Sequence, residues 1–272
     1  MNVALVDSHC HLDYPQFSDD FAGTIARAQN AGVGMMVSIG VKLTTFDQVR
    51  AIAEKSDHIY CTIGVHPHEA GEEGLSSPDA LLAKTSDPKV IGIGESGLDY
   101  FYDNAPRDAQ QQSFRAHIAA CRETGLPLIV HTRDADDDTM DILEEEYEKG
   151  PFTGVIHCFS SSAALAQRAL KIGFYISCSG IITFNSAKEI RAALENVPLD
   201  RLLVETDAPY LAPVPKRGKP NEPSYVAHTA AKLAEIKGVS IEDISRITTD
   251  NFFNLFTKAD RKHLLVPGAG AQ

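Results

Sequence analysis

The feature that most constrains the fold of this chain is a regular alternation of short apolar runs with helical segments. Eight runs have the length of a buried strand, and segments with apolar residues at helical spacing separate them. The runs are Val3–Asp7, Met35–Gly40, Ile59–Val65, Val90–Glu95, Pro127–Thr132, Thr153–Cys158, Phe174–Ser179 and Leu202–Thr206. Strands separated by helices form a parallel sheet with right-handed connections, and eight such units match the size of a TIM barrel. The alternation therefore predicts an α/β fold, a single (β/α)8 TIM barrel.

The main alternative is a doubly wound open sheet. That fold usually carries a glycine-rich phosphate-binding turn after its first strand, whereas this chain has His9, Cys10 and His11 there. A chain of 272 residues has room for two small domains, but no linker-like stretch or change of composition divides it. We therefore expect one barrel domain over residues 1–256. Residues 257–272 are polar, end in Pro-Gly-Ala-Gly-Ala-Gln and are expected to form a poorly ordered tail.

The charge balance and the cysteines narrow the class of protein. With 37 acidic and 25 basic residues the formal charge is −12, which argues against a protein that coats nucleic acid. A nuclease with a local metal cluster is compatible with that charge, because bound cations dominate the field inside an acidic site. The five cysteines form no CxxC pair and their number is odd, so we expect reduced thiols and a cytoplasmic protein. No apolar stretch approaches the roughly 20 residues that cross a bilayer, and we expect neither a membrane nor an obligatory protein partner.

The first apolar run leads into two histidines. Side chains two residues apart in an extended chain point to the same face, so His9 and His11 project together while Cys10 points away from them. Two neighbouring imidazoles form half of a site for a first-row metal ion. The alternative is a strand end with two hydrogen-bonded polar residues, and the choice depends on partners elsewhere in the chain.

Ionisable side chains follow five of the other seven runs, where a barrel builds its active site. They are His66, His68, Glu95, His131, Arg133, His157, Glu205 and Asp207. Ile91, Ile93 and Glu95 are expected to share one face of their strand. By contrast, His117 lies on a helical segment and is expected to occupy a core or surface position.

The residue types at these ends favour a binuclear metal site at the C-terminal ends of the strands. Four imidazoles (His9, His11, His131 and His157) and two carboxylates exceed the needs of one tetrahedral ion, and Glu95 is the best candidate for a bridging ligand. A metal-bound hydroxide could then attack phosphorus or carbon, with Asp207 taking the proton. The alternative is a polar layer that is satisfied by hydrogen bonds within the barrel. Buried charges without partners are costly, and metal coordination removes that cost.

Six sequence blocks resemble the TatD family of metal-dependent deoxyribonucleases, in order from about residue 3 to Phe256. They are Asp7-Ser-His-Cys-His11, Ile63-Gly-Val-His-Pro-His68, Gly94-Glu-Ser-Gly-Leu-Asp-Tyr100, His131-Thr-Arg-Asp134, His157-Cys-Phe-Ser160 and Glu205-Thr-Asp-Ala-Pro-Tyr210. The resemblance implies an amidohydrolase-type TIM barrel with two divalent ions, Mg2+, Mn2+ or Zn2+. It also implies hydrolysis of DNA phosphodiesters, as an exonuclease on single-stranded or frayed ends.

The resemblance also assigns roles to residues. It implies that His9, His11, Glu95 and Asp207 bind one metal ion, and that His131 and His157 bind the second together with a bridging Glu95. We expect Glu95, Asp207 and His66 to be the catalytic residues. The expected substrate contacts are Arg133, Tyr100, Ser160, Lys216 and Arg217. Ser161 and Asn185 depart from the residues usual in the family, glycine and lysine, which puts substrate contacts in doubt more than the metal centre.

Two of these contact groups have alternatives. The basic loop with Lys216 and Arg217 could be merely solvated, and the aromatics near Tyr100 could seal the barrel mouth. The main alternative function is hydrolysis of an amide, lactone or ester, including aminoacyl-tRNA deacylation. Many amidohydrolases bridge their metals with a modified lysine on the fourth strand, whereas this chain has Glu95, which favours phosphodiesters. A non-catalytic scaffold is a third possibility, but it would not need to keep every ligand position.

Overall fold

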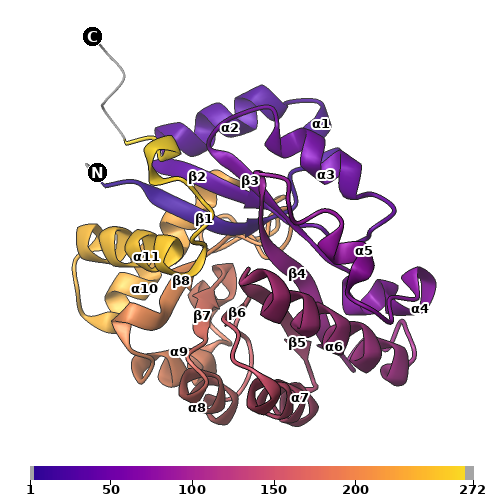
Figure 1. Cartoon of the computed structure of the whole chain (residues 1–272). Helices are drawn as coiled ribbons and strands as arrows, with labels where there is room; N and C mark the ends of the chain where they lie inside the picture. The colour runs from indigo at the N-terminus through magenta and orange to yellow at the C-terminus, as the bar shows by residue number, and fades with distance from the viewer. Residues whose placement is uncertain (1–2, 267–272) are drawn as a thin grey trace.

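The eight strands form one parallel sheet whose spatial order follows the sequence from β1 to β8. The computed structural model describes residues 3–266. Figure 1 looks along the barrel, with the strands at the centre and the helices around them. The strands are β1 Leu5–Cys10, β2 Val33–Ser38, β3 Ile59–Ile63, β4 Val90–Asp99, β5 Leu128–Arg133, β6 Gly154–Ile156, β7 Tyr175–Cys178 and β8 Leu202–Val204. The predicted (β/α)8 TIM barrel is confirmed.

The helices cover the outside of the sheet. The α-helices are α1 Pro15–Ser18, α2 Phe21–Asn30, α3 Phe46–Ala53, α4 Ala70–Glu73, α5 Asp79–Leu82, α6 Arg107–Thr124, α7 Asp136–Lys149, α8 Ala163–Lys171, α9 Lys188–Glu195, α10 Val226–Lys237 and α11 Ile241–Leu255. Short 3-10 turns are η1 Pro67–Glu69, η2 Gly180–Thr183, η3 Leu199–Arg201, η4 Pro223–Tyr225 and η5 Arg261–His263. Local signals set the ends: the Ser162 hydroxyl accepts a hydrogen bond from the Leu165 amide at the start of α8, and α6 ends at Gly125, which has a φ of 71°.

The lumen of the barrel is filled by apolar side chains, so it is a core and not a channel. Each strand contributes to this cluster, with Val6, Met35, Val37, Tyr60, Ile91, Ile129, Val155, Tyr175 and Leu203. Phe252 and Phe256, from the end of α11, pack into the same cluster. A solid interior leaves the two ends of the barrel as the places where polar side chains can gather.

The sheet is joined between its first and last strands at the carboxyl end. Cys10 and Ala208 form an isolated parallel bridge. The Asp207 amide donates to the His9 carbonyl at 2.9 Å, and the His11 amide donates to the Ala208 carbonyl at 2.8 Å. The seam of the barrel therefore lies at the level of the residues that the sequence singles out as metal ligands.

Two strands extend further than expected. β1 runs to Cys10, which places His9 inside the strand, and β4 runs to Asp99. The expectation that Ile91, Ile93 and Glu95 share a face is wrong, because Ile91 lies in the lumen and Ile93 packs on the outside under the helices. The register of β4 shifts against β3 beside Cys61 and against β5 between Ile93 and Ser96. Such bulges break the period of two and re-aim the side chains that follow.

The segment after α11 packs back onto the barrel as far as it is described. The Lys258 ammonium donates to the carbonyls of Thr85 and Asp87, and the Leu265 amide donates to the Gly34 carbonyl at 3.1 Å. The expected poorly ordered tail therefore does not apply to residues 257–266, and residues 267–272 lie outside the described residues. Among residues 3–266 no helix is both long and apolar enough to cross a membrane.

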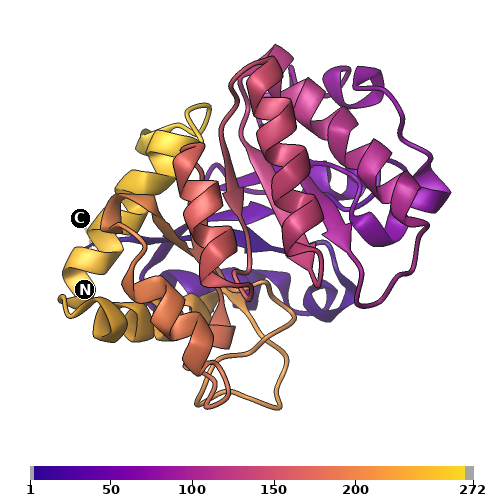
Figure 2. The same cartoon turned by 90° about the horizontal axis from the view of Figure 1, so that it is seen from below.

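The loops at the carboxyl end of the barrel are longer than those at the other end. Figure 2 shows the segment that follows β8, in orange, extending beyond the barrel. This segment connects β8 to α10 and carries Asp207, Tyr210, Lys216 and Arg217. The face that bears these loops is therefore the one on which a site can be built from several segments at once.

Candidate metal centre

The six expected metal ligands converge at the carboxyl end of the barrel. His9, Glu95 and His131 project from within β1, β4 and β5. Three others, His11, His157 and Asp207, lie one to three residues beyond the ends of β1, β6 and β8. They are buried or nearly so, although they come from segments far apart in the sequence. The barrel thus brings together what the sequence keeps separate.

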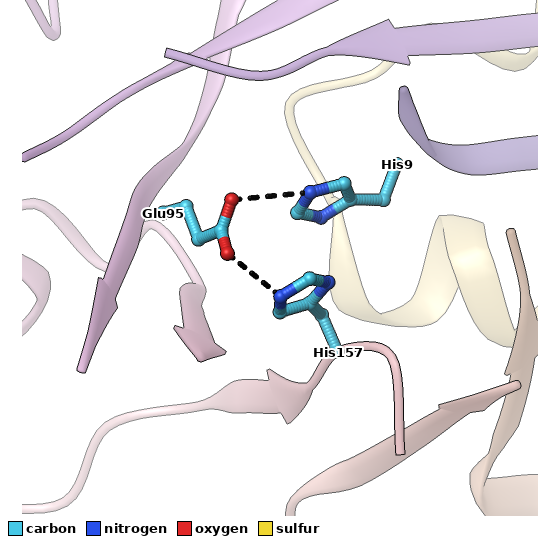
Figure 3. A group of neighbouring side chains, drawn as sticks. All are labelled: His9, Glu95 and His157. Atoms are coloured by element: carbon cyan, nitrogen blue, oxygen red, sulfur yellow. Dashed lines mark ion pairs between the residues drawn. The ribbon is translucent and has the colours of Figure 1, made fainter. Parts of the chain in front are cut away.

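Glu95 is the hub of this cluster. Figure 3 shows its carboxylate beside the adjacent rings of His9 and His157, with one oxygen directed toward each ring. Oε2 lies 3.3 Å from His9 Nε2, and Oε1 lies 2.8 Å from His157 Nε2. The two rings are stacked, with centroids 3.9 Å apart. A single carboxylate therefore contacts imidazoles from opposite parts of the chain.

One side of the hub is formed by the β1–β8 seam. Asp207 Oδ1 lies 3.4 Å from His11 Nε2 and 3.7 Å from His9 Nε2. Asp207 has a φ of 59°, in the left-handed region. This backbone conformation is uncommon for a residue other than glycine, and such strain is often found at functional sites.

The other side of the hub contains His66 and His131. Glu95 Oε1 lies 3.5 Å from His66 Nε2 and 3.0 Å from His131 Nδ1. The loop that bears His66 is anchored from α6, because the Val65 amide donates to His117 Nε2 at 2.9 Å. Of the two positions expected for His117, core or surface, it occupies the core, where it holds the end of β3.

Burial and neighbouring charges shift the pKa values of the clustered side chains in different directions. Burial would raise the pKa of Glu95, yet the surrounding histidines, His157 first, hold it well below its usual value. Burial opposes the charged form of His157, but Glu95 and Glu205 raise its pKa well above the usual value. Burial lowers the pKa of His66 well below 6.5, so its ring is neutral at pH 7. The site therefore contains both ionised and neutral groups within contact distance.

The cluster has the composition of a divalent-metal site. Three groups of residues each offer ligand atoms that lie within 4.8 Å of one another. They are His9 with Glu95 and His157, His9 with His11 and Asp207, and His66 with Glu95 and His131. Nδ1 of His9 and Nδ1 of His11 are buried without a hydrogen-bond partner among residues 3–266. Buried polar atoms of this kind are rare unless another group satisfies them. Mixed imidazole and carboxylate donors suit Zn, Mn and related divalent ions, so these residues fit a metal.

A second layer of hydrogen bonds orients the ligands. The carboxyl group of Asp7, whose pKa burial raises to about 8, accepts hydrogen bonds from the Thr206 amide at 2.8 Å and the Thr206 hydroxyl at 2.6 Å. Asn221 Nδ2 donates to the Thr206 carbonyl at 2.9 Å. Glu205 Oε1 lies 3.3 Å from His157 Nδ1 and accepts a hydrogen bond from the Cys158 amide. Partners of this type fix ring orientation in metal sites.

The sequence reasoning missed Asp99. Its Oδ2 lies 2.9 Å from His68 Nε2 and 3.1 Å from His131 Nε2, so it orients His131 from the side opposite Glu95. These contacts overcome the effect of burial and lower the pKa of Asp99. The signal was present in the sequence, because Glu95 and Asp99 are four residues apart and share a face once β4 is extended.

A cavity of about 470 Å3 opens above the cluster. It is lined by His11, His66, Glu95, His131, His157 and Asp207, together with Tyr14, Tyr102, Tyr210, Arg133 and Ser160 among others. This volume lies in the range of small-ligand sites. A larger cavity of about 1270 Å3 adjoins it and shares Arg133 and Ser160.

The expected substrate residues differ in their placement. Arg133 and Ser160 line the cavity over the cluster, as anticipated for contacts to substrate. Tyr100 lines only the larger cavity, where its hydroxyl donates to Asp138 at 2.8 Å. Lys216 and Arg217 border neither cavity; their cationic groups lie over the rings of Tyr225 and Phe184, at 5.0 and 3.8 Å. The structure thus brings two of these five residues to the candidate site.

Comparisons with known proteins agree with this geometry. The family model for TatD related DNase matches residues 6–257. The chain belongs to the TatD family. It is 42% identical over 255 residues to an uncharacterized metal-dependent hydrolase, YabD, of Bacillus subtilis, covering 93% of this chain and 98% of YabD. The confirmed membership makes the protein an enzyme of a metal-dependent hydrolase family.

Other relatives extend the comparison within the TatD family. The 3'-5' ssDNA/RNA exonuclease TatD of Enterobacter lignolyticus is 34% identical, and the match covers 93% of this chain and 98% of that protein. The crystal structure of YJJV, a TatD homolog from Escherichia coli, superposes with a TM-score of 0.87 at 31% identity, covering 94% of this chain and 99% of YJJV. The fold, the family and the cluster of potential ligands therefore agree.

Proposed function

We propose that this TatD-family protein is a deoxyribonuclease that hydrolyses DNA phosphodiester bonds, acting as an exonuclease on single-stranded or frayed ends. The observation that carries the proposal is the convergence of four imidazoles and two carboxylates in one cluster, five of which line a cavity that has Arg133 in its wall. Arg133 forms no ion pair among residues 3–266, and its guanidinium, which lies over the Phe101 ring, is available to a phosphate oxygen. The relative named as an ssDNA/RNA exonuclease supports the same substrate class.

The proposal assigns two divalent ions to the cluster, Mg2+, Mn2+ or Zn2+. His9, His11 and Asp207 would hold the first with Glu95, and His131 and His157 would hold the second with the shared Glu95. His66, 3.5 Å from Glu95, stands beside the second set. The first assignment is supported by the set of His9, His11 and Asp207, whose ligand atoms lie within 4.8 Å of one another. The second is supported by His157 Nε2, which lies 3.5 Å from His131 Nδ1 and 2.8 Å from Glu95 Oε1.

Divalent ions held by these residues would polarise a phosphoryl oxygen and activate water for displacement. Asp207 lines the cavity, and contact with His11 lowers its pKa although burial opposes the charge, so it can accept a proton at neutral pH. Glu95 is ionised for the same kind of reason and orients the histidines around it. Neutral His66 can bind an ion or hydrogen-bond the substrate, and Ser160 faces the same cavity.

The test is cleavage of end-labelled oligonucleotides by protein that has been stripped of metal and reloaded with each ion in turn. We expect release of mononucleotides from single strands, slower release from blunt duplexes, and full inhibition by EDTA. Glu95→Gln keeps the shape of the side chain and removes its charge, and we expect it to reduce both activity and bound metal at least 100-fold. His228→Gln, on α10, is the matched control, since His228 lines neither cavity.

A substrate panel separates this proposal from the alternative function. The same preparations would be given a lactone, an amide, an aminoacyl ester, RNA and a simple phosphodiester. Hydrolysis of a carbon ester or amide with no attack on DNA, or nuclease activity that persists in Glu95→Gln, would overturn the nuclease assignment. A cytoplasmic setting belongs to the same proposal, and the free state of all five cysteines is compatible with it.

A further inference from the structure

Exposed aromatic side chains are confined to one face of the barrel. Among the Phe and Tyr residues of the described chain, three are more than half exposed: Phe101 at 53%, Tyr102 at 58% and Tyr210 at 51%. All three lie in the segments that follow β4 and β8, at the carboxyl end of the sheet. Large apolar surfaces grouped at a functional face mark a binding surface more often than chance exposure does.

Two of these rings stand on different sides of the metal cluster. Tyr102 and Tyr210 both line the cavity of about 470 Å3. The Tyr102 ring lies 5.4 Å from the ring of His68, near the side that contains His131. The Tyr210 ring lies 6.2 Å from the ring of His11, on the side of the β1–β8 seam. A ligand bound over the cluster would therefore meet one aromatic ring in each direction.

The backbones of both tyrosines are fixed to residues of the cluster. The Tyr102 amide donates at 2.9 Å to Asp99, whose other oxygen contacts His131. The Tyr210 amide donates to the Asp207 carbonyl at 2.9 Å, and Asn221 Nδ2 donates to the Tyr210 carbonyl at 2.6 Å. The backbone positions from which these exposed rings project are therefore fixed relative to the ligands.

A cation completes the surface. The Arg133 guanidinium lies 4.6 Å from the centroid of the Phe101 ring and borders the same cavity as Tyr102. Aromatic faces next to an unpaired arginine suit a ligand that combines planar rings with an anionic backbone, as a single nucleic acid strand does.

We propose that Tyr102 and Tyr210 are stacking platforms for the two nucleobases that flank the cleaved linkage, with Arg133 on a phosphate oxygen. The inference rests on the proposed nuclease function and adds to it the residues that hold the bases. Bases in a duplex are stacked on one another and are not free to meet both rings. The paired platforms therefore account for a preference for single-stranded or frayed ends, with no dependence on base sequence.

The test uses metal-loaded protein and short oligonucleotides that carry 2-aminopurine near one end and phosphorothioate linkages that slow hydrolysis. Stacking on a tyrosine quenches 2-aminopurine fluorescence, and the chain contains no Trp to interfere. We expect Tyr102→Leu and Tyr210→Leu, which keep apolar bulk but remove the ring, to weaken binding roughly 5- to 150-fold each and to reduce the quenching. Tyr102→Phe and Tyr210→Phe should retain both. Phe253→Leu, which removes a ring that Arg261 covers at the other end of the barrel, is the matched control.

A second substrate locates the effect. Replacing the terminal nucleoside with a propanediol spacer removes the base that one tyrosine holds. On that substrate the leucine variant of this tyrosine should therefore lose much less binding affinity, relative to wild type, than it loses on the full oligonucleotide. The stacking proposal is wrong if wild type cleaves DNA but the leucine variants bind the oligonucleotide and quench its fluorescence as wild type does. It is also wrong if the phenylalanine variants lose as much binding affinity as the leucine variants. If wild type cleaves no nucleic acid at all, it is the nuclease function that fails. Circular dichroism and metal content of each variant exclude a folding defect.

Discussion

His117 makes the stability of the barrel sensitive to acid, and one substitution tests this. The side chain is fully buried in α6, where Nδ1 donates to the Ser113 carbonyl at 2.7 Å and Nε2 accepts from the Val65 amide at 2.9 Å. Protonation of Nε2 would destroy the acceptor that holds the end of β3. Burial accordingly lowers the pKa of His117 from 6.5 to about 4.

The pKa shift sets both the sign and the size of the effect. Because the folded state binds the proton less tightly than the unfolded state, the stability is intact above pH 6.5 and is lost as the pH falls toward 4. A shift of roughly 2.5 units corresponds to about 3 kcal/mol in full, at 1.36 kcal/mol per unit. Between pH 7.5 and pH 5 the expected loss is about 2 kcal/mol.

The assay is urea unfolding of wild type and His117→Gln in EDTA, at several pH values from 7.5 to 5. Glutamine retains an acceptor for Val65 but does not titrate, and both proteins share the other histidines, whose contributions cancel in the difference. We expect the stability advantage of wild type over the variant to shrink by about 2 kcal/mol across this range. A difference that stays constant within about 0.5 kcal/mol would refute the account of His117 as a buried neutral acceptor.

Three further predictions concern the supports of the site and the fold. Thr206→Val removes the hydroxyl that donates to the buried Asp7 carboxyl group. It should lower the free energy of unfolding in urea by about 1–3 kcal/mol and weaken metal binding measured by titration calorimetry. Thr206→Ser, which keeps the hydroxyl, should retain both the stability and the metal affinity. Glu146 accepts hydrogen bonds from Arg115 and Lys149, and against the effect of burial these cations lower its pKa to about 2. Glu146→Gln should therefore lower the free energy of unfolding by about 1–3 kcal/mol at pH 7, a range that allows for the solvent exposure of the partners. This loss of stability should vanish as the pH falls from 4.5 to 2. Protein in EDTA should unfold at a lower thermal midpoint than protein in a divalent metal salt, and the difference should grow as the metal concentration is raised. Reloading the metal should reverse the loss. An unchanged midpoint would mean that the folded protein does not bind the ion.

The parts of the structure that follow a simple period could be predicted from the sequence. Strand ends in a parallel barrel meet at one face, so a polar residue at the end of each apolar run could be assigned to the site without knowing the fold in detail. His9 and His11 illustrate this, since their spacing alone places them together, as their rings 5.2 Å apart confirm. Cys10, between them, packs on the outside of the sheet as expected.

The parts that depend on irregular backbone could not be predicted in this way. The bulges of β4 place Ile93 on the outer face, and the strand continues to Asp99. No local sequence pattern predicts the position of a bulge. The loop after β8 was expected to bring Lys216 and Arg217 to the site, but its path is set by tertiary contacts such as that of Arg217 with Phe184. Loop conformation depends on such contacts and has no period to read.

The joint between β1 and β8 has a consequence for when this chain can acquire chemistry. His9 is among the first residues to be synthesised and Asp207 among the last of the barrel, and the same hydrogen bonds that join their backbones also close the ring of strands. A chain cut short before Asp207 therefore lacks closure and lacks a complete set of ligands at once. The closed barrel and the complete ligand cluster are therefore acquired in the same step of synthesis.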